Sequence, residues 1–130
     1  MPSRSKADLM PLLAQAYDSA VSKYQQTYPN APQPFITCTF RSDEEQEQLF
    51  RKRPKVTNAR AGQSPHNYKP SYAFDIAFIG LNKQLDWSNK HFSNFAAIIK
   101  AIEPQVEWGG DWAKFKDAPH FQVRHWNKLL

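Results

Sequence analysis

The sequence predicts a single compact α+β domain in which helices pack around a small antiparallel sheet. Its 130 residues fall within the ~100–150 residues that are typical of one domain. A hydrophobic fraction of 41% with 14% aromatic residues supplies apolar surface for a core and excludes a disordered chain. The apolar pattern predicts the order helix, strand, helix, loop, strand, helix and two short strands, which is typical of α+β domains. We therefore expect one domain that spans residues 1–130.

The first predicted helix begins close to residue 8. Apolar side chains recur every three or four residues from Leu9 to Tyr24, which is the spacing of one helical face. We expect Asp8 to cap this helix, and Pro11 to lie in its first turn, where a missing N–H costs nothing. The turn-rich run 29–32 predicts the end of the helix.

A strand and a second helix follow. The run 34–40 is rich in β-branched and aromatic residues, which predicts a strand. Ser42 with Glu45 three residues later has the pattern of a capping box, which predicts the start of a helix. Acidic residues at this start and basic residues near Arg53 both interact favourably with the helix dipole. Pro54 is expected to end the helix.

The second half of the chain contains a loop, one helix and three strands. Residues 55–72 have no helical period, so we expect an ordered loop there. Asp86 or Ser88 is expected to cap a third helix, which ends before Pro104. The expected strands are residues 72–78, 105–108 and 120–123.

Composition and charge exclude several classes of protein. The one cysteine, Cys38, excludes an internal disulfide framework and any zinc site built from several cysteines, and we expect it to be buried. No run approaches the ~18 apolar residues of a membrane helix. The N-terminal residues do not have the pattern of a secretory signal. A net charge of +5 favours anionic partners such as nucleic acid, a lipid surface or an acidic polymer.

Two histidines and two aspartates have the spacing of a catalytic metal site. His66 precedes the strand that contains Asp75, and Asp117 stands three residues before His120. Two neutral imidazoles and one carboxylate around an open position are ligands typical of catalytic zinc, and a second carboxylate can act as a base. Scattered surface polar residues are the alternative, because the two pairs lie far apart in the chain.

Three ordered motifs resemble those of one family of zinc metallopeptidases. Residues 63–75 contain Ser-Pro-His and Ala-Phe-Asp, which are similar to the family's Ser-x-His and Ala-x-Asp signature. Residues 108–121 resemble its second signature, in which an acid stands three residues before the last zinc ligand. Residues 40–49 are similar to its upstream Arg-Ser, Glu-Gln and Leu segment. The family contains D-alanyl-D-alanine carboxypeptidases and L-alanyl-D-glutamate endopeptidases of peptidoglycan, and the resemblance spans about residues 35–123.

The resemblance implies a single catalytic peptidase domain with a zinc cleft. Carried over by position, it implies that the zinc ligands are His66, Asp75 and His120. It makes Asp117 the catalytic base. Arg41 would bind a substrate carboxylate or stabilise the developing oxyanion, and Ser64 would contact substrate or orient a ligand.

Two details refine this resemblance. The run 56–60 and the Gly-Gly-Asp-Trp turn look more like the L-alanyl-D-glutamate endopeptidase branch, which includes phage endolysins. The interval from His66 to Asp75 is nine residues, two longer than the family pattern, and the family's glycine after the histidine is missing. We expect the extra residues to bulge outward while the strand still delivers Asp75 to the site.

The resemblance implies a zinc-dependent peptidoglycan peptidase that hydrolyses the L-alanyl-D-glutamate bond of the stem peptide through a metal-activated water. A D-alanyl-D-alanine carboxypeptidase on the same scaffold is one alternative. A basic module that binds nucleic acid or another anionic polymer without hydrolysis is the other. For the peptidase we expect Zn²⁺ as cofactor, the stem peptide as partner, no nucleic acid and a monomer. We expect a phage or prophage protein that stays cytoplasmic until a holin releases it to the bacterial cell wall.

Other residues near these motifs have structural interpretations. His91 is expected at the surface, and neither Glu107 as an alternative base nor His125 as a fourth ligand fits a motif. Arg41 could instead pair with acids at the start of the second helix, and Ser64 could bond its own backbone. The aromatic residues expected in the core, with one of them facing the cleft, are Trp108, Trp112, Phe115 and Phe121.

Overall fold

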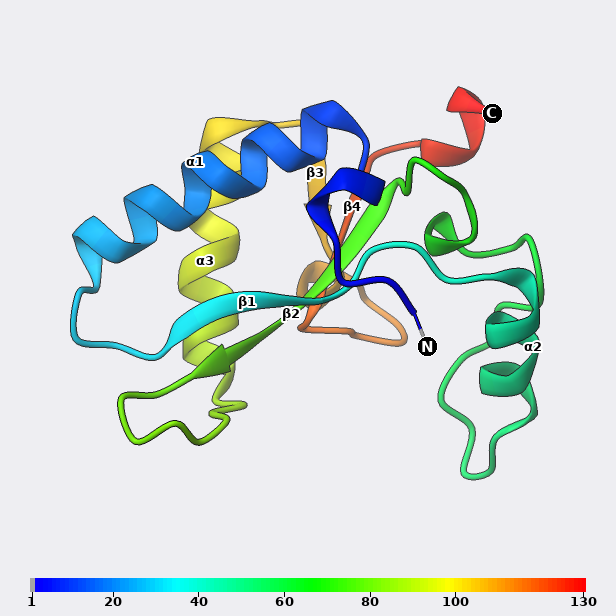
Figure 1. Ribbon diagram of the computed structural model, residues 1–130, viewed down its shortest axis with the longest axis horizontal. Coiled ribbons are helices and arrows are strands. Elements are labelled where there is room, and N and C mark those ends of the chain that lie inside the picture. Colours follow the sequence, from blue (N-terminus) through cyan, green and yellow to red (C-terminus); the bar gives the residue numbers. More distant parts are fainter. Residues whose placement is uncertain (1) are drawn as a thin grey trace.

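The computed structural model describes residues 2–130 and confirms the α+β class (Figure 1). The helices are α1 (Pro11–Thr27), α2 (Asp43–Arg51) and α3 (Asn89–Ile102), and the strands are β1 (Gln33–Cys38), β2 (Ala73–Ile79), β3 (Val106–Trp108) and β4 (His120–Val123). Short 3₁₀ helices cover Lys6–Asp8, Pro65–Asn67, Gly109–Asp111 and Trp126–Leu129. Within the described part of the chain, no helix combines the length and the apolar character needed to cross a bilayer.

The four strands form one antiparallel sheet in the order β1-β2-β4-β3. Asp75 of β2 pairs with His120 of β4 on one side and with Cys38 of β1 on the other. The register between β1 and β2 shifts just before Cys38. Because side chains alternate between the two faces of a strand, Phe74 and Phe121 point away from the face that carries Asp75 and His120. The sheet therefore has an apolar face and a face with polar residues.

Helices α1 and α3 cover the apolar face of the sheet, and the core lies between these layers (Figure 1). The rings of Phe74 and Phe121 stack with centroids 5.3 Å apart. Tyr17 of α1 meets Phe74 edge-on at 5.3 Å, and Phe95 of α3 meets Phe121 edge-on at 5.5 Å. Each fully buried aromatic ring contributes roughly 1.5–3 kcal/mol by leaving water. The packing of these rings fixes the position of β2 relative to β4.

Helix α2 lies apart from the other helices, beyond the end of β1 (Figure 1). Its predicted capping box is confirmed, since the Ser42 hydroxyl accepts a hydrogen bond from the Glu45 N–H and the Glu45 carboxylate accepts one from the Ser42 N–H. Gln46 on this helix is fully buried and donates to the Ala59 carbonyl at 2.6 Å. The helix thus anchors the loop that follows it.

Glu47 ties the same loop to α2 a second time. Its carboxylate accepts a hydrogen bond from the Ala61 N–H at 2.8 Å and pairs with the Arg60 guanidinium at 3.0 Å. The bond to Arg60, with the backbone bond to Ala61, lowers the pKa of Glu47 to about 2. These contacts hold in place the predicted loop, whose later part forms one wall of the candidate site.

The start of α1 differs from the prediction. The helix begins at Pro11, and Met10 precedes it without a side-chain cap. Asp8 instead accepts a hydrogen bond from the Ser3 hydroxyl at 2.6 Å, and Leu9 forms a parallel bridge with Ser71. Because this bridge requires extended backbone at Leu9, the helical spacing of apolar residues runs past the point where the helix begins.

His91 is buried, so the prediction that it lies at the surface is wrong. Its ring packs 5.6 Å from that of Phe78, and its Nε2 lies 3.1 Å from the Asp86 carboxylate. The same carboxylate accepts a hydrogen bond from the Ser88 N–H just before α3. This local network satisfies the imidazole of His91 inside the fold, and Ser88 itself makes no side-chain cap.

The capping box of α2 provides a test of the fold. We expect Ser42→Ala to lower the free energy of unfolding by about 1 kcal/mol, because the Glu45 N–H at the helix start loses the hydroxyl that accepts its hydrogen bond. Ser19→Ala, at an exposed position inside α1, is the matched control and should change stability little or raise it slightly. Urea denaturation followed by circular dichroism measures both, and equal stability of the two variants would contradict the role of the cap.

Candidate active site

All of the site residues expected from the sequence line a single hollow of about 350 Å³ on the polar face of the sheet. These residues are Arg41, Ser64, His66, Asp75, Asp117 and His120. Strands β2 and β4 supply Asp75 and His120, and the 3₁₀ helix Pro65–Asn67 supplies His66. Neither Glu107 nor His125 is among the lining residues. The fold thus gathers segments that are distant in the sequence.

Asp75 is the centre of this group. His66 Nε2 lies 3.2 Å from Asp75 Oδ1, and His120 Nδ1 lies 3.0 Å from the same oxygen. The contact with His120 follows from the sheet, because the two residues are direct cross-strand partners. Two imidazole nitrogens therefore converge on one carboxylate oxygen.

The position of His66 is fixed by the turn before β2. The Ser64 hydroxyl accepts a hydrogen bond from the His66 N–H at 3.2 Å, as in a helix cap. On the ring, Nδ1 lies 2.7 Å from the Thr39 carbonyl oxygen. Because a carbonyl can only accept, Nδ1 must carry a hydrogen, and Nε2 is the nitrogen left to face Asp75.

The longer interval between His66 and Asp75 does not separate them. Lys69 and Pro70 are exposed, and the chain returns to the interior at Ser71. The Ser71 hydroxyl donates to the Thr39 carbonyl at 2.8 Å, which is the carbonyl that also orients His66. The extra residues thus bulge outward, as expected from the sequence.

The charges at the centre stabilise one another. Burial disfavours the charged forms of both His66 and Asp75, but their mutual attraction and hydrogen bonding outweigh it. The pKa of His66 is raised to about 10, and the pKa of Asp75 is held well below its usual range by His66 together with His120. The site therefore favours positive charge beside the Asp75 carboxylate.

These residues fit a catalytic zinc ion. Two imidazole nitrogens and a carboxylate oxygen are the donor types that such sites use, with room left for water or substrate. Metal-bound histidines usually donate their other N–H to a carbonyl, carboxylate or water, and His66 has the Thr39 carbonyl in that position. The donor set of His66, Asp75 and His120 is thus matched to the metal that the sequence predicts.

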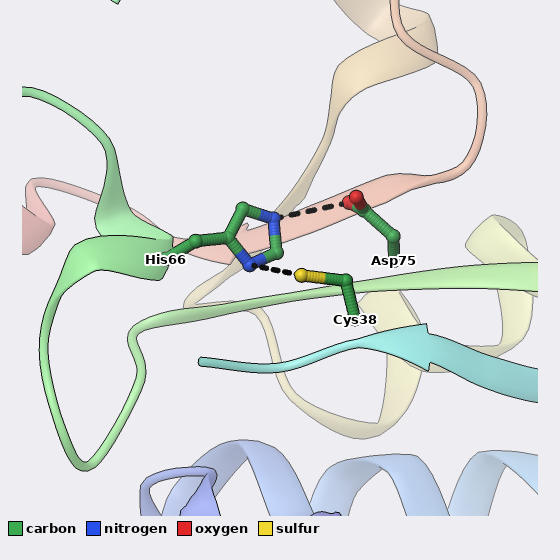
Figure 2. Close-up of side chains that lie close together, drawn as sticks. All are labelled: Cys38, His66 and Asp75. Atoms are coloured by element: carbon green, nitrogen blue, oxygen red, sulfur yellow. Dashed lines mark hydrogen bonds and ion pairs between the residues drawn. The ribbon is translucent and has the colours of Figure 1, made fainter. Parts of the chain in front are cut away.

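Cys38 is a neighbour of the site that the sequence did not reveal. Figure 2 shows His66 between Asp75 and Cys38, with a different ring nitrogen facing each. The Cys38 sulfur lies 3.6 Å from His66 Nδ1, and Cys38, His66 and Asp75 offer ligand atoms within 4.8 Å of one another. Since the Thr39 carbonyl already engages Nδ1, Cys38 faces the side of the ring that does not point into the donor set. Its expected burial is confirmed.

Asp117 lies at the open rim of the hollow. Although Asp117 is exposed as a whole, the protein partly covers its carboxyl group and raises its pKa above the ordinary value, and the Asp75 carboxylate adds to this rise. The positive charges of His120, His66 and Arg41 act in the opposite direction. A carboxyl group with a raised pKa suits a group that must both take and return a proton.

Arg41 points toward the site and away from the acids of α2. Its Nη1 donates to the Gln46 side-chain oxygen at 2.9 Å, and its Nη2 lies 3.8 Å from Asp75 Oδ2. The alternative of a pair with Asp43 or Glu44 is therefore wrong. Gln46 is itself fixed by the Ala59 carbonyl, so the guanidinium is held in one place beside the hollow.

The aromatic residues near the site divide into three groups. Trp108 and Phe121 are buried, as expected, and Trp112 lines the hollow with its ring 5.3 Å from that of His120. Phe115 is 78% exposed, so its expected place in the core is wrong. Its backbone φ of 55° lies in the left-handed region, where the loop between Trp112 and His120 turns outward.

Gln122 lines the hollow and was missed by the sequence analysis. It stands two residues after His120 in β4, and alternate residues of a strand share a face. The predicted strand 120–123 therefore contained the signal that could have identified it.

Known proteins that this chain matches show what it is similar to. The family model described as D-alanyl-D-alanine carboxypeptidase matches residues 57–123. The peptidoglycan L-alanyl-D-glutamate endopeptidase CwlK of Bacillus subtilis (strain 168) is 36% identical over 102 residues, which cover 68% of this chain and 59% of CwlK. The crystal structure of the L-Ala D-Glu endopeptidase ChiX of Serratia marcescens has a TM-score of 0.73 at 18% identity, and the match covers 100% of this chain and 95% of that chain. The likeness to ChiX shows the fold, and the chain spans about three-fifths of the length of CwlK.

Cys38 and Asp75 face different ring nitrogens of His66. Replacement of Cys38 and replacement of His120 should therefore affect zinc binding differently. We expect His120→Ala to lose bound zinc, because it removes a nitrogen from the Asp75 side. Cys38→Ala should keep zinc, because the sulfur faces the nitrogen that bonds to the Thr39 carbonyl. Elemental analysis after dialysis, with thermal unfolding to confirm that both variants fold, measures this. Loss of zinc in the cysteine variant alone would show that the metal lies on the other side of the ring.

Proposed function

This chain belongs to the D-alanyl-D-alanine carboxypeptidase family of peptidoglycan peptidases, and on that premise we propose that it is a zinc-dependent endopeptidase of the bacterial cell wall. The proposed reaction is hydrolysis of the bond between L-alanine and D-glutamate in the stem peptide. Similarity to CwlK over 102 residues supports this choice of bond.

One observation carries the proposal. His66 and His120 each bring a ring nitrogen to the same oxygen of Asp75, in a hollow whose rim holds a second carboxylate, Asp117. Structural carboxylates usually pair with cations or backbone N–H groups, whereas Asp117 has a raised pKa beside a cluster suited to a metal. A metal site with a separate acid–base group is the arrangement that peptide hydrolysis requires.

The residues have distinct roles in the proposed mechanism. When bound by His66, Asp75 and His120, zinc supplies a Lewis acid and lowers the pKa of water toward neutrality. Asp117 takes the proton from the water that adds to the scissile carbonyl carbon. It then returns that proton to the nitrogen as the C–N bond breaks, so the amine leaves in neutral form. Arg41, fixed by Gln46, places positive charge where the carbonyl oxygen gains negative charge or where a substrate carboxylate binds.

The shape of the cleft supports cleavage within a chain. A second hollow of about 560 Å³ adjoins the first, and both share Val56, Thr57, Ala59, Trp112 and Asp117 as lining residues. An endopeptidase must accommodate substrate on both sides of the scissile bond. A carboxypeptidase needs space for only one terminal residue on the amine side, so the extended cleft favours the endopeptidase.

Four finer parts of the interpretation stay predictions. These are the identity of the metal as zinc, the action as a phage or prophage endolysin with release through a holin, and the monomeric state. A single catalytic domain over residues 1–130 belongs to the same set.

Replacement of Asp117 tests the proposed mechanism. We expect Asp117→Asn to keep bound zinc but to lower hydrolysis of purified peptidoglycan by roughly 10²–10⁴-fold, because the amide cannot carry the proton. Asp111→Asn is the matched control, since Asp111 is exposed and pairs with Lys100 outside the hollow, and it should keep full activity. Unchanged hydrolysis by the Asp117 variant would contradict its role.

Mass spectrometry of the fragments in the same experiment identifies the bond. Stem peptides that begin with D-glutamate support the endopeptidase, whereas free D-alanine indicates the carboxypeptidase. Binding to an anionic polymer that weakens steeply with salt, together with no hydrolysis that a chelator inhibits, would instead indicate a basic binding module.

A further inference from the structure

The second hollow is basic, although the candidate metal site beside it is centred on a carboxylate. Lys55 and Lys116 are exposed among its lining residues, and Asp117 is the one acid that lines it. Lys116 Nζ lies 3.4 Å from the Gly110 carbonyl, and Lys55 Nζ lies 5.5 Å from the centre of the Phe50 ring. Within residues 2–130, neither ammonium group forms an ion pair with a carboxylate. Two lysines without a carboxylate partner thus line this hollow.

The position of Asp117 relates this hollow to the substrate. Asp117 lines both hollows and therefore stands at their boundary. In the proposed mechanism it returns a proton to the departing nitrogen, so the residue that carries that nitrogen must lie beside it. The hollow beyond Asp117 is accordingly on the amine side of the scissile bond. For the proposed substrate, the residue on that side is D-glutamate.

We propose that Lys55 and Lys116 form a subsite that binds the free carboxylate of the D-glutamyl residue. This inference rests on the proposed function and specifies how the same cleft selects its substrate. A glutamyl residue within a peptide uses one of its two carboxyl groups in the chain and keeps the other as an anion. Two ammonium groups at the rim of a cleft provide the complementary charge.

Two exposed apolar side chains complete the subsite. Phe115 and Val56 line the second hollow and are 78% and 61% exposed. Phe115 stands directly before Lys116 in the chain, and Val56 directly after Lys55, so each ammonium group has an apolar neighbour. Apolar walls beside the lysines suit the methylene groups of a glutamyl side chain. The exposure of Phe115, unexpected from the sequence, is explained by this role.

The test uses two synthetic stem peptides that differ only in the D-glutamyl residue, which carries either a free carboxylate or a primary amide. In the Lys55→Gln, Lys116→Gln double variant, we expect kcat/KM for the carboxylate peptide to fall on the order of tenfold. The value for the amide peptide should not change, since that peptide has no charge to lose. Lys114→Gln is the matched control, because Lys114 is exposed in the same loop but lines neither hollow.

Binding measured separately distinguishes failure of the subsite from failure of the proposed function. Calorimetric titration of zinc-free protein should give tighter binding of the carboxylate peptide by the wild type than by the double variant. Equal losses for both peptides, or the same loss in the Lys114 control, would overturn the subsite alone. Preferential binding of the carboxylate peptide without cleavage would overturn the proposed function alone. If the protein neither cleaves the peptides nor prefers the carboxylate peptide, both the subsite and the proposed function are overturned.

A second inference comes from a hydrogen-bond chain behind His120. His120 Nε2 lies 2.7 Å from the Gln122 side-chain oxygen, and the Gln122 amide nitrogen donates to the Glu107 carboxylate. Gln122 is buried, and Glu107 is its direct cross-strand partner in β3. The three side chains therefore lie in a row on the polar face of the sheet.

The chemistry of this row determines which nitrogen of His120 is free. A carboxylate can only accept hydrogen bonds, so the amide group of Gln122 turns its NH₂ toward Glu107 and its oxygen toward His120. That oxygen also only accepts, so Nε2 of His120 carries a hydrogen, and Nδ1 is the nitrogen that faces Asp75 and that a metal ion would meet. We infer that Gln122 and Glu107 are positioning residues that keep His120 in the form able to bind a metal through Nδ1. They do for His120 what the Thr39 carbonyl does for His66.

An exchange of the two polar groups tests this inference. Gln122→Leu should weaken zinc affinity about 10- to 100-fold, measured by competition with a chelator in the absence of substrate. The Glu107→Gln, Gln122→Glu double variant again places an acceptor beside His120 and a donor between the strands, so it should recover most of the affinity. Gln105→Leu, at an exposed position before β3, should bind zinc as the wild type does.

A spectroscopic readout separates positioning from general damage to the fold. The ¹⁵N chemical shifts of His120 in the zinc-bound protein should report a metal-bound Nδ1 and a protonated Nε2 in the wild type and in the exchanged variant, and a mixture of forms in Gln122→Leu. Thermal unfolding establishes that each variant is folded. Unchanged zinc affinity in Gln122→Leu, or no recovery in the folded exchanged variant, would overturn the inference.

Discussion

The alternation of side chains along β2 and β4 is the constraint on which both the core and the candidate site depend. Phe74 and Phe121 face the helices, whereas their chain neighbours Asp75 and His120 face the hollow. A slip of one residue in the pairing would turn the rings outward and bury the carboxylate and imidazole in the core. Packing of the aromatic rings thus holds Asp75 opposite His120. A change that disturbs the core is therefore expected to displace the site residues as well.

The candidate metal ligands depend on groups that do not belong to the ligand set. The Thr39 carbonyl orients His66, and Gln122 orients His120, so each imidazole presents a defined nitrogen to Asp75. Ser71 and Gln46 act one step further out, by fixing the strand end that carries Thr39 and the guanidinium of Arg41. Burial makes each of these contacts costly to lose, because an unpaired polar group in the interior has no water to replace its partner.

Charge is distributed unevenly along the cleft. The centre holds the Asp75 carboxylate, which attracts a cation, while Arg41 stands beside it and two lysines line the adjoining hollow. The net charge of +5 is therefore not spread evenly over the surface. Two of its lysines line the hollow where the proposed acidic peptide would enter. The basic residues at the end of α2 have an ordinary explanation, because they complement the helix dipole.

The sequence alone determined the features that depend on neighbours along the chain. The capping box of α2 and the bounds of β4 were predicted as they are observed, because both follow from short-range hydrogen bonding and the alternation of side chains. Spacing and family resemblance also selected the residues that line the hollow, although their roles remain predictions.

Only the tertiary structure decided what depends on segments far apart in the sequence. The register shift that places Cys38 opposite Asp75, the cross-strand pair of Glu107 with Gln122, and the burial of His91 all arise from pairing and packing of separate elements. The outward turn of Phe115 was equally hidden, because its apolar character favours a core position and only the path of the loop sets it at the cleft. Local patterns record which conformations a segment prefers. Contacts between segments follow from how those conformations pack together, and that packing decides which side chains meet.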